Sequence, residues 1–481
     1  MDEKSGAQIS RKAFIQSFLI LFLLMMVAGV LTRVIPTGSF QRLDPEDSTS
    51  AIIPGSFKLT SQAPLAVWHW FTAPVEVLWK NGSESIKLIS IIVFILLVSS
   101  AFAVLDKSGI LQSLLGKIVT KFGGRKYVLL LAVSFFFMLM GAFFGVFEEI
   151  VPLVPLMIAL AYSLGWDALV GLGMSILATN MGFSAAISNP FTIGVAQSLA
   201  GLDMFSGWQF RIPIFLAVYG VLAWFLWSYA RKIDRKPESS LMYADDQASR
   251  AKYQKVTFES NPHLMRAGLF FLAFVVLIIL VLVGTQFSSF LSDYAFVLAG
   301  LLFFIGGLGA GFLSGAKGKL IGRALLDGIS GMAPAIPLML MAYSVKYLVT
   351  IGGVMDTILN SASGVLQGTS AMSAILIIYA LALFFEIFIG SGSAKAFLLM
   401  PILAPLADLV GVTRQLTVTA YCFGDGFSNM AYPTNAVLLI AIGLASVGYG
   451  KWMKFTWKLW VGVAVVTVFF LWLGIRIGYG M

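Results

Sequence analysis

The stretch NMGFSAAISNP, residues 180–190, interrupts a long apolar segment with Asn, Ser, Gly and Pro, and GDGFSNMAYPTN, residues 424–435, does the same later in the chain. The first apolar segment, residues 168–202, would form about 52 Å of continuous helix, whereas the hydrocarbon core of a bilayer is only about 30 Å thick. We therefore expect a broken helix at each place. Unwound backbone inside a membrane persists only where protein buries it or where it lines a cavity.

The composition is that of a membrane protein. Hydrophobic residues make up 59% of the chain and charged residues 11%, and the mean hydropathy is +0.91. The apolar runs are too long for the alternating strands of a membrane barrel, so we predict an all-α polytopic membrane protein. The first run, residues 14–32, ends without a small-residue cleavage site and indicates an anchor rather than a signal peptide. One cysteine, Cys422, and two histidines, His69 and His263, favour neither a disulfide nor a zinc site.

Hydropathy predicts about nine spans and two re-entrant hairpins. The hairpins are 127–165 and 371–410, and the arm 150–164 is only about 22 Å long as a helix, which is too short to cross. The discontinuous helices are 168–202 and 414–446. The remaining spans are 14–35, 86–105, 208–230, 266–285, 291–313, 326–349 and 456–478.

The charges between the spans predict an orientation. With a cytoplasmic N-terminus, the inner loops hold 22 of the 32 lysines and arginines and the outer side holds 8. Such an excess in short loops is what the positive-inside rule expects. The net charge of +9 is therefore explained by membrane orientation, and we do not expect nucleic acid as a partner.

The chain contains an internal repeat. SGILQSLL (108–115) resembles GGVMDTIL (352–359), and GFS recurs from 182 to 426, both at a separation of 244 residues. The repeat divides the chain into residues 1–230 and 266–481, joined by a polar linker at 231–265, which we place in the cytoplasm.

The two halves are predicted to be inverted. The segment 107–124 lies on the inner side and carries lysines, whereas its counterpart, 351–368, lies outside and carries neither Lys nor Arg. Inverted repeats with discontinuous helices are typical of secondary transporters, which bind solute and coupling ion at midplane. The alternative is that the glycines and the repeat reflect helix packing alone.

Three runs carry a resemblance to a known family. GFSAAISNPFTIGVAQSLAGL (182–202), FEEIVPLVPLMIALAYSLGWD (147–167) and SGSAKAFLLMPILAPLADLVGV (391–412) resemble the YfcC type of the C4-dicarboxylate anaerobic carrier family, within the ion transporter superfamily. The resemblance implies a bacterial inner-membrane carrier with a scaffold, a mobile transport unit, an elevator motion and a homodimer. It leaves the solute open, because relatives are described as dicarboxylate carriers or as basic amino acid antiporters.

The hairpin tips supply the first candidates for a solute site. Glu148 and Glu149 form one tip, and the repeat places Lys395 of the other tip, GSGSAK (390–395), opposite Glu149. A charge near the bilayer centre needs a partner or a function. The alternatives are that the tips reach water, or that Glu149 and Lys395 form a purely structural pair. The substrate-binding candidates are Glu148, Glu149, Ser188, Asn189, Ser391, Gly392, Ser393, Lys395, Asn429, Thr434 and Asn435.

The breaks supply candidates for a coupling ion. Their oxygens suit a cation such as Na⁺, and Asp425 is the best candidate for carrying H⁺. Glu386 could also face the cavity, and Pro190 and Pro433 mark where the second half-helices restart. We expect no cofactor other than the coupling ion. The coupling-ion candidates are Asn180, Gly182, Ser184, Asp425 and Ser428.

The net negative charge of these candidates favours a small amino acid, basic ones first, over a dicarboxylate, which would need co-bound Na⁺ or H⁺. An intramembrane hydrolase is a distant alternative. YCFGD (421–425) lacks the first glycine of a GxGD motif, and Ser393 and Lys395 are one residue too close for SxxK. A channel would need a continuous polar pore. We therefore predict a secondary transporter rather than an enzyme, acting on a small solute within the lipid bilayer.

Overall fold

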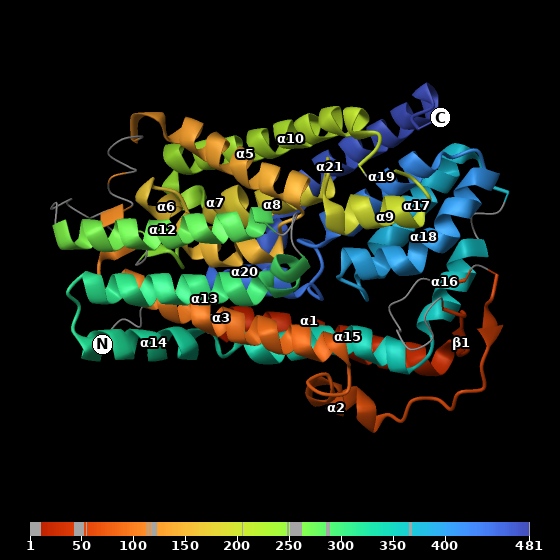
Figure 1. Ribbon diagram of the computed structural model, residues 1–481, viewed down its shortest axis with the longest axis horizontal. Coiled ribbons are helices and arrows are strands. Elements are labelled where there is room, and N and C mark those ends of the chain that lie inside the picture. Colours follow the sequence, from red (N-terminus) through yellow and green to blue (C-terminus); the bar gives the residue numbers. More distant parts are fainter. Residues whose placement is uncertain are drawn as a thin grey trace.

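The computed structural model describes residues 11–42, 52, 53, 55–111, 113, 114, 117, 123–203, 205–247, 250, 262–284, 289–364 and 368–480. Within these residues the regular structure is almost entirely helical, and most helix axes run along the longest axis of the molecule (Figure 1). Six of the described helices are long and apolar enough to cross a membrane. The prediction of an all-α polytopic membrane protein is confirmed.

Long helices form a layer in the lower part of Figure 1. Within it α3 packs against α13 and α14, α12 packs against α13, and α1 packs along α15. Small residues allow close approach: a Cβ on Gly307 would lie 2.8 Å from the Cβ of Ala101. The helices are α1 (Arg11–Val34), α3 (Ser83–Lys107), α12 (Pro262–Gly284), α13 (Ser289–Leu313), α14 (Gly318–Met332) and α15 (Ala335–Ile351).

A small cap that the sequence analysis did not foresee covers one end of this layer. Strand β1 (Gly38–Ser39) pairs antiparallel with β2 (Lys58–Leu59), and helix α2 (Trp68–Glu76) packs on α15. Helix α16 (Met355–Gly364) contacts β1, where Asp356 accepts a hydrogen bond from the Phe40 backbone N–H at 2.9 Å. The cap therefore joins segments from both halves of the sequence.

The predicted hairpin 127–165 corresponds to two helices with a 3-10 turn between them. The second helix, α6, has 10 residues, about 15 Å, and is too short to cross a hydrocarbon core. The following segment, 168–202, is interrupted as expected: helix ends at Ser184 and resumes at Pro190. The elements are α5 (Lys126–Phe144), η2 (Glu148–Leu153), α6 (Val154–Ser163), α7 (Ala168–Leu172), η3 (Gly173–Leu177), α8 (Ala178–Ser184), η4 (Pro190–Gly194) and α9 (Val195–Leu199).

The second set of elements has the same order. Helices α17 (Ala371–Glu386) and α18 (Gly392–Leu409) form the second hairpin, and α19 (Arg414–Ser428) and α20 (Ala436–Leu444) are separated by an unwound stretch. Figure 1 places α17 and α18 in the right half of the molecule, and α6 and α7 in the left half. The hairpins thus approach from opposite ends, as an inverted repeat requires, although the repeat itself stays a prediction.

The two sets interlock. Elements η4 and α9, which follow the first break, pack on α18, whereas α20, which follows the second break, packs on η2 and α6. Helices α10 (Trp208–Arg235) and α21 (Tyr449–Ile477) pack together beside both sets. Each break is therefore enclosed by the hairpin of the other half.

The part of the linker that the structure describes holds the start of the first broken helix. Tyr229 and Ser240 donate hydrogen bonds to Asp167 Oδ2 at 2.7 and 2.6 Å, and Asp246 accepts one from the Ala168 N–H at 2.9 Å. A short 3-10 turn, η5 (Pro237–Ser239), lies between these donors. Residues 251–261 of the predicted linker lie outside the described residues.

Three expectations need revision or remain outside the description. The predicted span 326–349 begins earlier, at Gly318, and is divided into α14 and α15 at Pro334, because proline cannot continue the hydrogen bonds of a helix. Pro433 does not restart a helix: α20 begins at Ala436. Much of the predicted amphipathic segment 107–124 lies outside the described residues.

Candidate functional site

The two breaks meet where α8 and α19 cross. A Cβ on Gly426 would lie only 2.4 Å from Ser184 Oγ and 2.6 Å from Ser184 Cα, so the two helix backbones are in direct contact. The sequence analysis required residues 182–190 and 424–433 to converge, and they do. Ser184 and Gly426 are both buried, which places the crossing inside the protein.

Each break ends with an asparagine that caps the next helical element. Asn189 Oδ1 accepts hydrogen bonds from the N–H groups of Phe191 and Thr192, at 2.9 and 3.3 Å. Asn435 Oδ1 does the same for Val437 and Leu438, at 3.0 and 3.3 Å. Such caps satisfy N–H groups that a helix start leaves without partners, a need that is greatest where water is absent.

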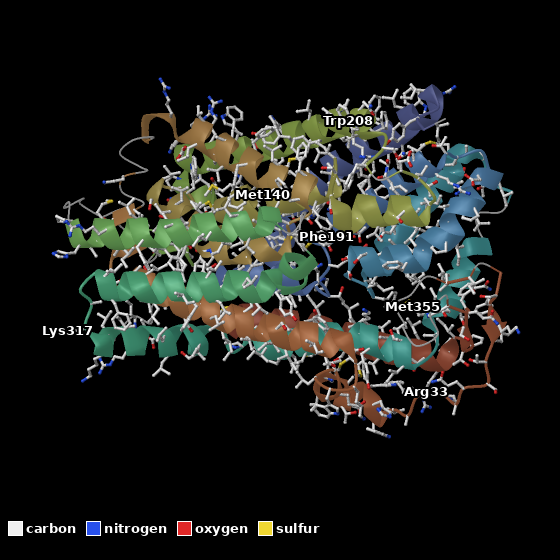
Figure 2. The ribbon with its side chains drawn as sticks, viewed as in Figure 1. Arg33, Met140, Phe191, Trp208, Lys317 and Met355 are labelled. Atoms are coloured by element: carbon white, nitrogen blue, oxygen red, sulfur yellow. The ribbon has the colours of Figure 1, made fainter. Side chains whose placement is uncertain are left out.

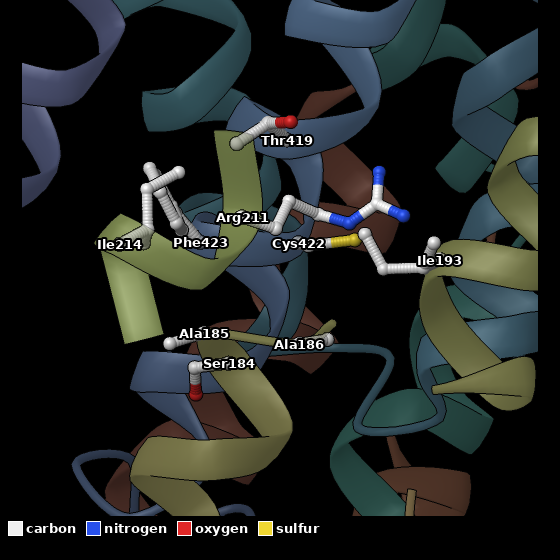
Figure 3. A pocket seen from close by; sticks show the side chains of 9 residues that line it. All are labelled: Ser184, Ala185, Ala186, Ile193, Arg211, Ile214, Thr419, Cys422 and Phe423. Atoms are coloured by element: carbon white, nitrogen blue, oxygen red, sulfur yellow. The ribbon is translucent and has the colours of Figure 1, made fainter. Parts of the chain in front are cut away.

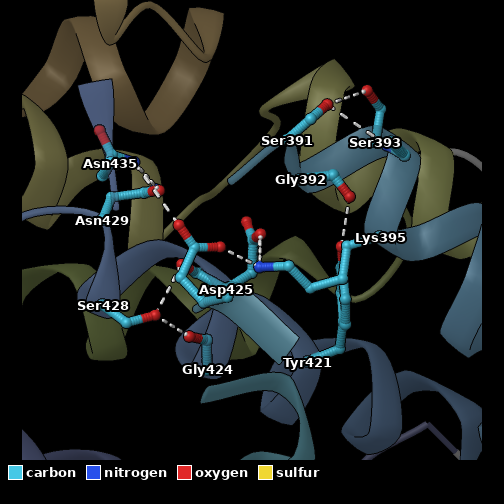
Figure 4. A network of polar contacts seen from close by, with 12 residues as sticks. Ser391, Gly392, Ser393, Lys395, Tyr421, Gly424, Asp425, Ser428, Asn429 and Asn435 are labelled. Atoms are coloured by element: carbon cyan, nitrogen blue, oxygen red, sulfur yellow. Dashed lines mark hydrogen bonds and ion pairs between the residues drawn. The ribbon is translucent and has the colours of Figure 1, made fainter. Parts of the chain in front are cut away.

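A buried cluster of three charged residues lies beside the second break (Figure 4). Lys395 Nζ donates to Asp425 Oδ1 at 2.7 Å and also to Glu386 Oε2. The exposed fractions of Lys395, Glu386 and Asp425 are 0%, 1% and 0%. With all three ionised, the cluster carries a net charge of −1 in a region of low dielectric constant, where such a charge is costly.

Two of these charges oppose the electrostatics of their own helices. Glu386 is the last residue of α17 and Lys395 lies in the first turn of α18, whereas a helix dipole favours a cation at its C-terminus and an anion at its N-terminus. The stability of the two helices therefore does not explain why a charged residue stands at either position. Both are held by the ion pairs that the tertiary fold creates, and residues that break local rules in this way mark functional sites.

Glycines let the tip between α17 and α18 approach the carboxylates. A Cβ on Gly392 would lie 2.7 Å from Asp425 Oδ2, a distance that real Cβ atoms do not tolerate. The same glycine accepts a hydrogen bond from the Tyr421 hydroxyl through its carbonyl oxygen. Asp425 Oδ2 itself is buried and has no hydrogen-bond partner among the described residues.

Amides complete the cluster on its other side. Asn435 Nδ2 donates to Asn429 Oδ1 at 2.8 Å and lies 3.5 Å from Glu386 Oε1. Asn435 therefore links the cap of α20 to the charged residues. The arrangement offers carboxylates to a cation and a helix N-terminus with amide groups to an anion.

Two residues anchor the breaks to the helices beside them. Arg211 of α10 is 2% exposed and donates to the Ile187 carbonyl from Nε and Nη2, at 3.1 and 2.9 Å. Trp452 of α21 donates its indole N–H to the Met430 carbonyl at 2.7 Å. Ile187 and Met430 are separated by 243 residues, as are Pro190 and Pro433. The two anchors thus satisfy corresponding carbonyls.

Arg211 also borders a small pocket between the halves (Figure 3). Ser184 and Ala185 from the first break and Cys422 and Phe423 from α19 line it together with Arg211. Further donors of the guanidinium are directed at the carbonyls of Phe205 and Ser206. The pocket therefore has walls from both halves of the chain.

The structure brings most predicted site residues together. Ser391 accepts from the Ala394 N–H, and its hydroxyl lies 3.5 Å from that of Ser393. Lys395 contacts Glu386 and Asp425. The side chains of Glu148 and Glu149 lie outside the description, so a pairing of Lys395 with Glu149 stays a prediction. Ser188 donates to the Phe143 carbonyl at 3.3 Å, and Thr434 Oγ1 has no partner among the described residues.

The predicted coupling-ion residues fall into two groups. Ser184 and Ser428 donate to the backbone carbonyls of Asn180 and Gly424, at 2.7 and 2.6 Å, while neither polar side-chain atom of Asn180 has a partner among the described residues. Gly182 has a packing role, since a Cβ there would lie 1.8 Å from the Met138 carbonyl oxygen of α5.

Three residues of this region are not among the site residues predicted from sequence. Glu386 was noted only as a residue that could face the cavity, and its position at a helix C-terminus was the signal that could have raised its rank. Arg211 was counted among outer charges, although it is buried. Tyr421, one turn before Asp425, gave no signal, because a buried tyrosine is common in membrane helices.

The comparison with protein families decides the family. The model described as "C4-dicarboxylate anaerobic carrier" matches residues 14–476. The chain belongs to this family. The carrier is 30% identical over 477 residues to an Escherichia coli (strain K12) protein named "Putative basic amino acid antiporter YfcC", covering 92% of this chain and 93% of that one. It is also 27% identical to an uncharacterized protein of Haemophilus influenzae, with the same coverage.

Two solved structures are similar along most of the chain. The YdaH transporter of Alcanivorax borkumensis is 18% identical with a TM-score of 0.42, covering 96% of this chain and 99% of that one. MtrF of Neisseria gonorrhoeae, presented as illuminating a class of antimetabolite efflux pumps, is 17% identical with a TM-score of 0.43, covering 97% and 95%. The family and the curated relative point to a transporter rather than an enzyme.

Proposed function

We propose that this carrier is a secondary active transporter that moves a small amino acid, basic ones first, by exchange or with a coupled ion. The observation that carries the proposal is the Lys395–Glu386–Asp425 cluster, which is fully buried, has a net negative charge and lies where the two breaks meet. A negative site inside a membrane attracts a cationic group. The name of the Escherichia coli relative supports the same solute class.

The solute is proposed to bind between the halves. Its cationic group faces Glu386 and Asp425, and its carboxylate faces uncharged donors such as the amide of Asn189. The hairpins and broken helices then move as a unit against the layer formed by α3, α13 and α14, which corresponds to an elevator motion. We place the carrier in a bacterial inner membrane with a cytoplasmic N-terminus, as a homodimer.

A dicarboxylate is the second candidate solute. The description of the family favours it, and Lys395 offers a cation for one carboxylate. Because Glu386 and Asp425 outnumber Lys395, the binding of an anion would require co-bound Na⁺ or H⁺. Dependence of succinate uptake on one of these ions is the signature of this alternative.

Counterflow in proteoliposomes distinguishes the two solutes. Vesicles containing the purified carrier are loaded with unlabelled L-arginine, L-alanine or succinate, and uptake of the labelled solute is measured with and without Na⁺. We expect accumulation of labelled arginine. Accumulation of labelled succinate alone would show that the solute is a dicarboxylate. Passage of a labelled solute without counterflow would indicate a channel.

Two substitutions locate the site. Asp425→Asn and Glu149→Gln are expected to leave membrane insertion intact and to abolish or uncouple transport, because each removes a carboxylate that we assign to solute or coupling ion. Wild-type uptake by both purified variants would contradict the site assignment. A thermal-shift screen of amino acids and carboxylates, with and without Na⁺, tests binding separately, since a ligand that binds the folded state raises its melting temperature.

A further inference from the structure

The buried charges of the cluster do not balance. Glu386 and Asp425 contribute two negative charges and Lys395 one positive charge, and all three side chains are removed from water. A single uncompensated charge in such a place is disfavoured by several kcal/mol. One further positive charge would therefore make the cluster neutral.

We propose that the Glu386–Asp425 pair holds one proton when no solute is bound and releases it when the cationic group of the solute arrives, so that the carrier exchanges one proton for one cation. This inference rests on the proposed function, because it concerns the same site. Two positive charges are needed to balance the two carboxylates. Lys395 always supplies one, and either the proton or the cationic group of the solute supplies the other. The exchange is electroneutral, since the buried cluster is neutral in both loaded states.

Local geometry supports a proton on this pair. Asp425 Oδ2 is buried without a partner among the described residues, and Glu386 lies at the negative end of the α17 dipole, which disfavours its ionised form. Two carboxylates that share one lysine titrate together, so the proton belongs to the pair rather than to either residue. The released proton replaces the cation that enters, and no covalent bond changes.

The other titratable groups near the pair do not supply the missing charge. Tyrosine and cysteine side chains surround it and are neutral at physiological pH. Arg211 of α10 is a cation, but its hydrogen bonds go to backbone carbonyls and to the Tyr479 hydroxyl. These surrounding groups are Tyr421, Cys422 and Tyr432.

The first test needs no solute. Infrared spectroscopy of the purified full chain carrying Asp246→Asn, which removes a linker carboxyl that is partly protonated at neutral pH, is expected to show the C=O band of a protonated carboxylic acid, shifted in deuterium oxide. The band should be lost in Glu386→Gln and in Asp425→Asn, where one carboxylate faces Lys395. It should return in Glu386→Gln/Lys395→Met, where the remaining carboxylate again lacks a counter-ion. Lys454→Met, which removes an exposed lysine, is the matched control.

The second test measures coupling. Proteoliposomes that enclose a pH dye are given external L-arginine. We expect one proton to leave the lumen for each arginine that enters, with a rate that responds to a pH gradient and not to a potassium–valinomycin potential. The Glu386→Gln variant should lose this exchange, and the double variant should recover it.

The outcomes separate the two proposals. A wild-type band without arginine transport would overturn the proposed solute and leave the proton site in place. Arginine exchange without proton release, or a band that Glu386→Gln leaves unchanged, would overturn the proton exchange. Absence of the band in the solute-free wild type would also overturn it and would indicate that Arg211 balances the cluster. Failure of the folded double variant to release protons would also overturn it, because the proposal gives Lys395 no role in the exchange beyond its charge.

Discussion

The first and second breaks share a backbone design and differ in charge. Asn189 and Asn435 each cap the element that follows, and Arg211 and Trp452 each hold a carbonyl in the unwound stretch. Residues 185–189 of the first break carry no charged side chain, the charge there being that of Arg211 from α10, and Asn189 Nδ2 has no partner among the described residues. Around the second, the corresponding amide reaches Glu386. The same arrangement of caps and anchors can therefore support a site whose charges lie on one side only.

The largest difference between the breaks should appear when the caps are made acidic. Both Asn435→Asp and Asn189→Asp keep the oxygen that caps the helix. Only the change at 435 replaces a donor to Glu386 with a third carboxylate, so we expect loss of transport and destabilisation by about 3–5 kcal/mol, the scale of an uncompensated buried charge. Asn189→Asp should keep the stability of the wild type, because a helix N-terminus favours a negative charge, and should weaken transport without abolishing it, because the new carboxylate faces that of the solute.

Transport assays and melting curves of the two purified variants give the comparison. Equal losses in both variants would show that the charge asymmetry of the breaks has no functional role. Asn435→Ser, which keeps a capping oxygen without adding charge, serves as the control.

The next largest difference is expected between the stabilities lost on removing the two anchors, Arg211 and Trp452. Arg211→Gln removes a buried cation that satisfies the carbonyls of Ile187, Phe205 and Ser206, whereas Trp452→Phe removes one donor to Met430. Each carbonyl left without a partner costs about 1–3 kcal/mol, so the loss at Arg211 should be severalfold larger. Thermal unfolding of the two purified variants in detergent measures both losses of stability. A larger loss for Trp452→Phe would contradict the expected order.

Two glycines of the second tip provide a finer comparison. A Cβ on Gly392 would collide with Asp425 Oδ2, whereas one on Gly390 would lie 3.7 Å from Glu386 Oε1, an ordinary contact. We expect Gly392→Ala to displace the carboxylate, lower the transport rate and destabilise the fold by about 1–3 kcal/mol. Gly390→Ala should be close to wild type. Initial rates of counterflow decide between them, and similar rates would indicate that the tip adjusts freely.

The smallest effect on transport is expected at the linker. Burial raises the pKa of Asp246 from its ordinary 3.8 to about 7, and the hydrogen bond from Ala168 N–H opposes this shift. The folded state therefore holds the proton more tightly than the unfolded state. The resulting stabilisation is complete below about pH 4 and is lost as pH rises to about 7, by at most about 1.4 kcal/mol per pH unit. Asp246→Asn should remove this contribution to the pH dependence of the melting temperature and leave transport at neutral pH unchanged.

Much of the fold follows from sequence, because membrane physics is restrictive. A segment such as 168–202 is too long for one span and carries polar residues at its middle, so its interruption could be predicted from helix rise and bilayer thickness alone. The hairpin 371–410 was predicted from two apolar arms around a short tip; its second arm, α18, is long enough to cross a membrane, so its re-entrance stays a prediction. The division of 326–349 at Pro334 was missed although proline is a local signal of a helix end, and the β1–β2 cap was missed because it depends on which neighbours are present.

The candidate site was only partly predictable. Polar residues in the breaks had to lie inside protein, and for this reason Asp425, Asn429 and Asn435 were identified from sequence. Lys395 was identified too, and the structure adds Glu386 and Asp425 as its partners, whereas its pairing with Glu149 at the matching position of the repeat stays a prediction. A constant separation along the chain relates equivalent positions of the two halves. Which side chains touch where two helices cross depends on the rotation of each helix about its axis and on its depth in the membrane.

The sequence by itself determined that this chain is a helical membrane protein with two interrupted helices, because hydrophobic length and backbone hydrogen bonding leave few other solutions in lipid. Only the tertiary structure decided that Glu386, Lys395 and Asp425 share one buried cluster. They are separated along the chain and lie on three helices, and their attraction becomes strong only after packing excludes the water that would screen it.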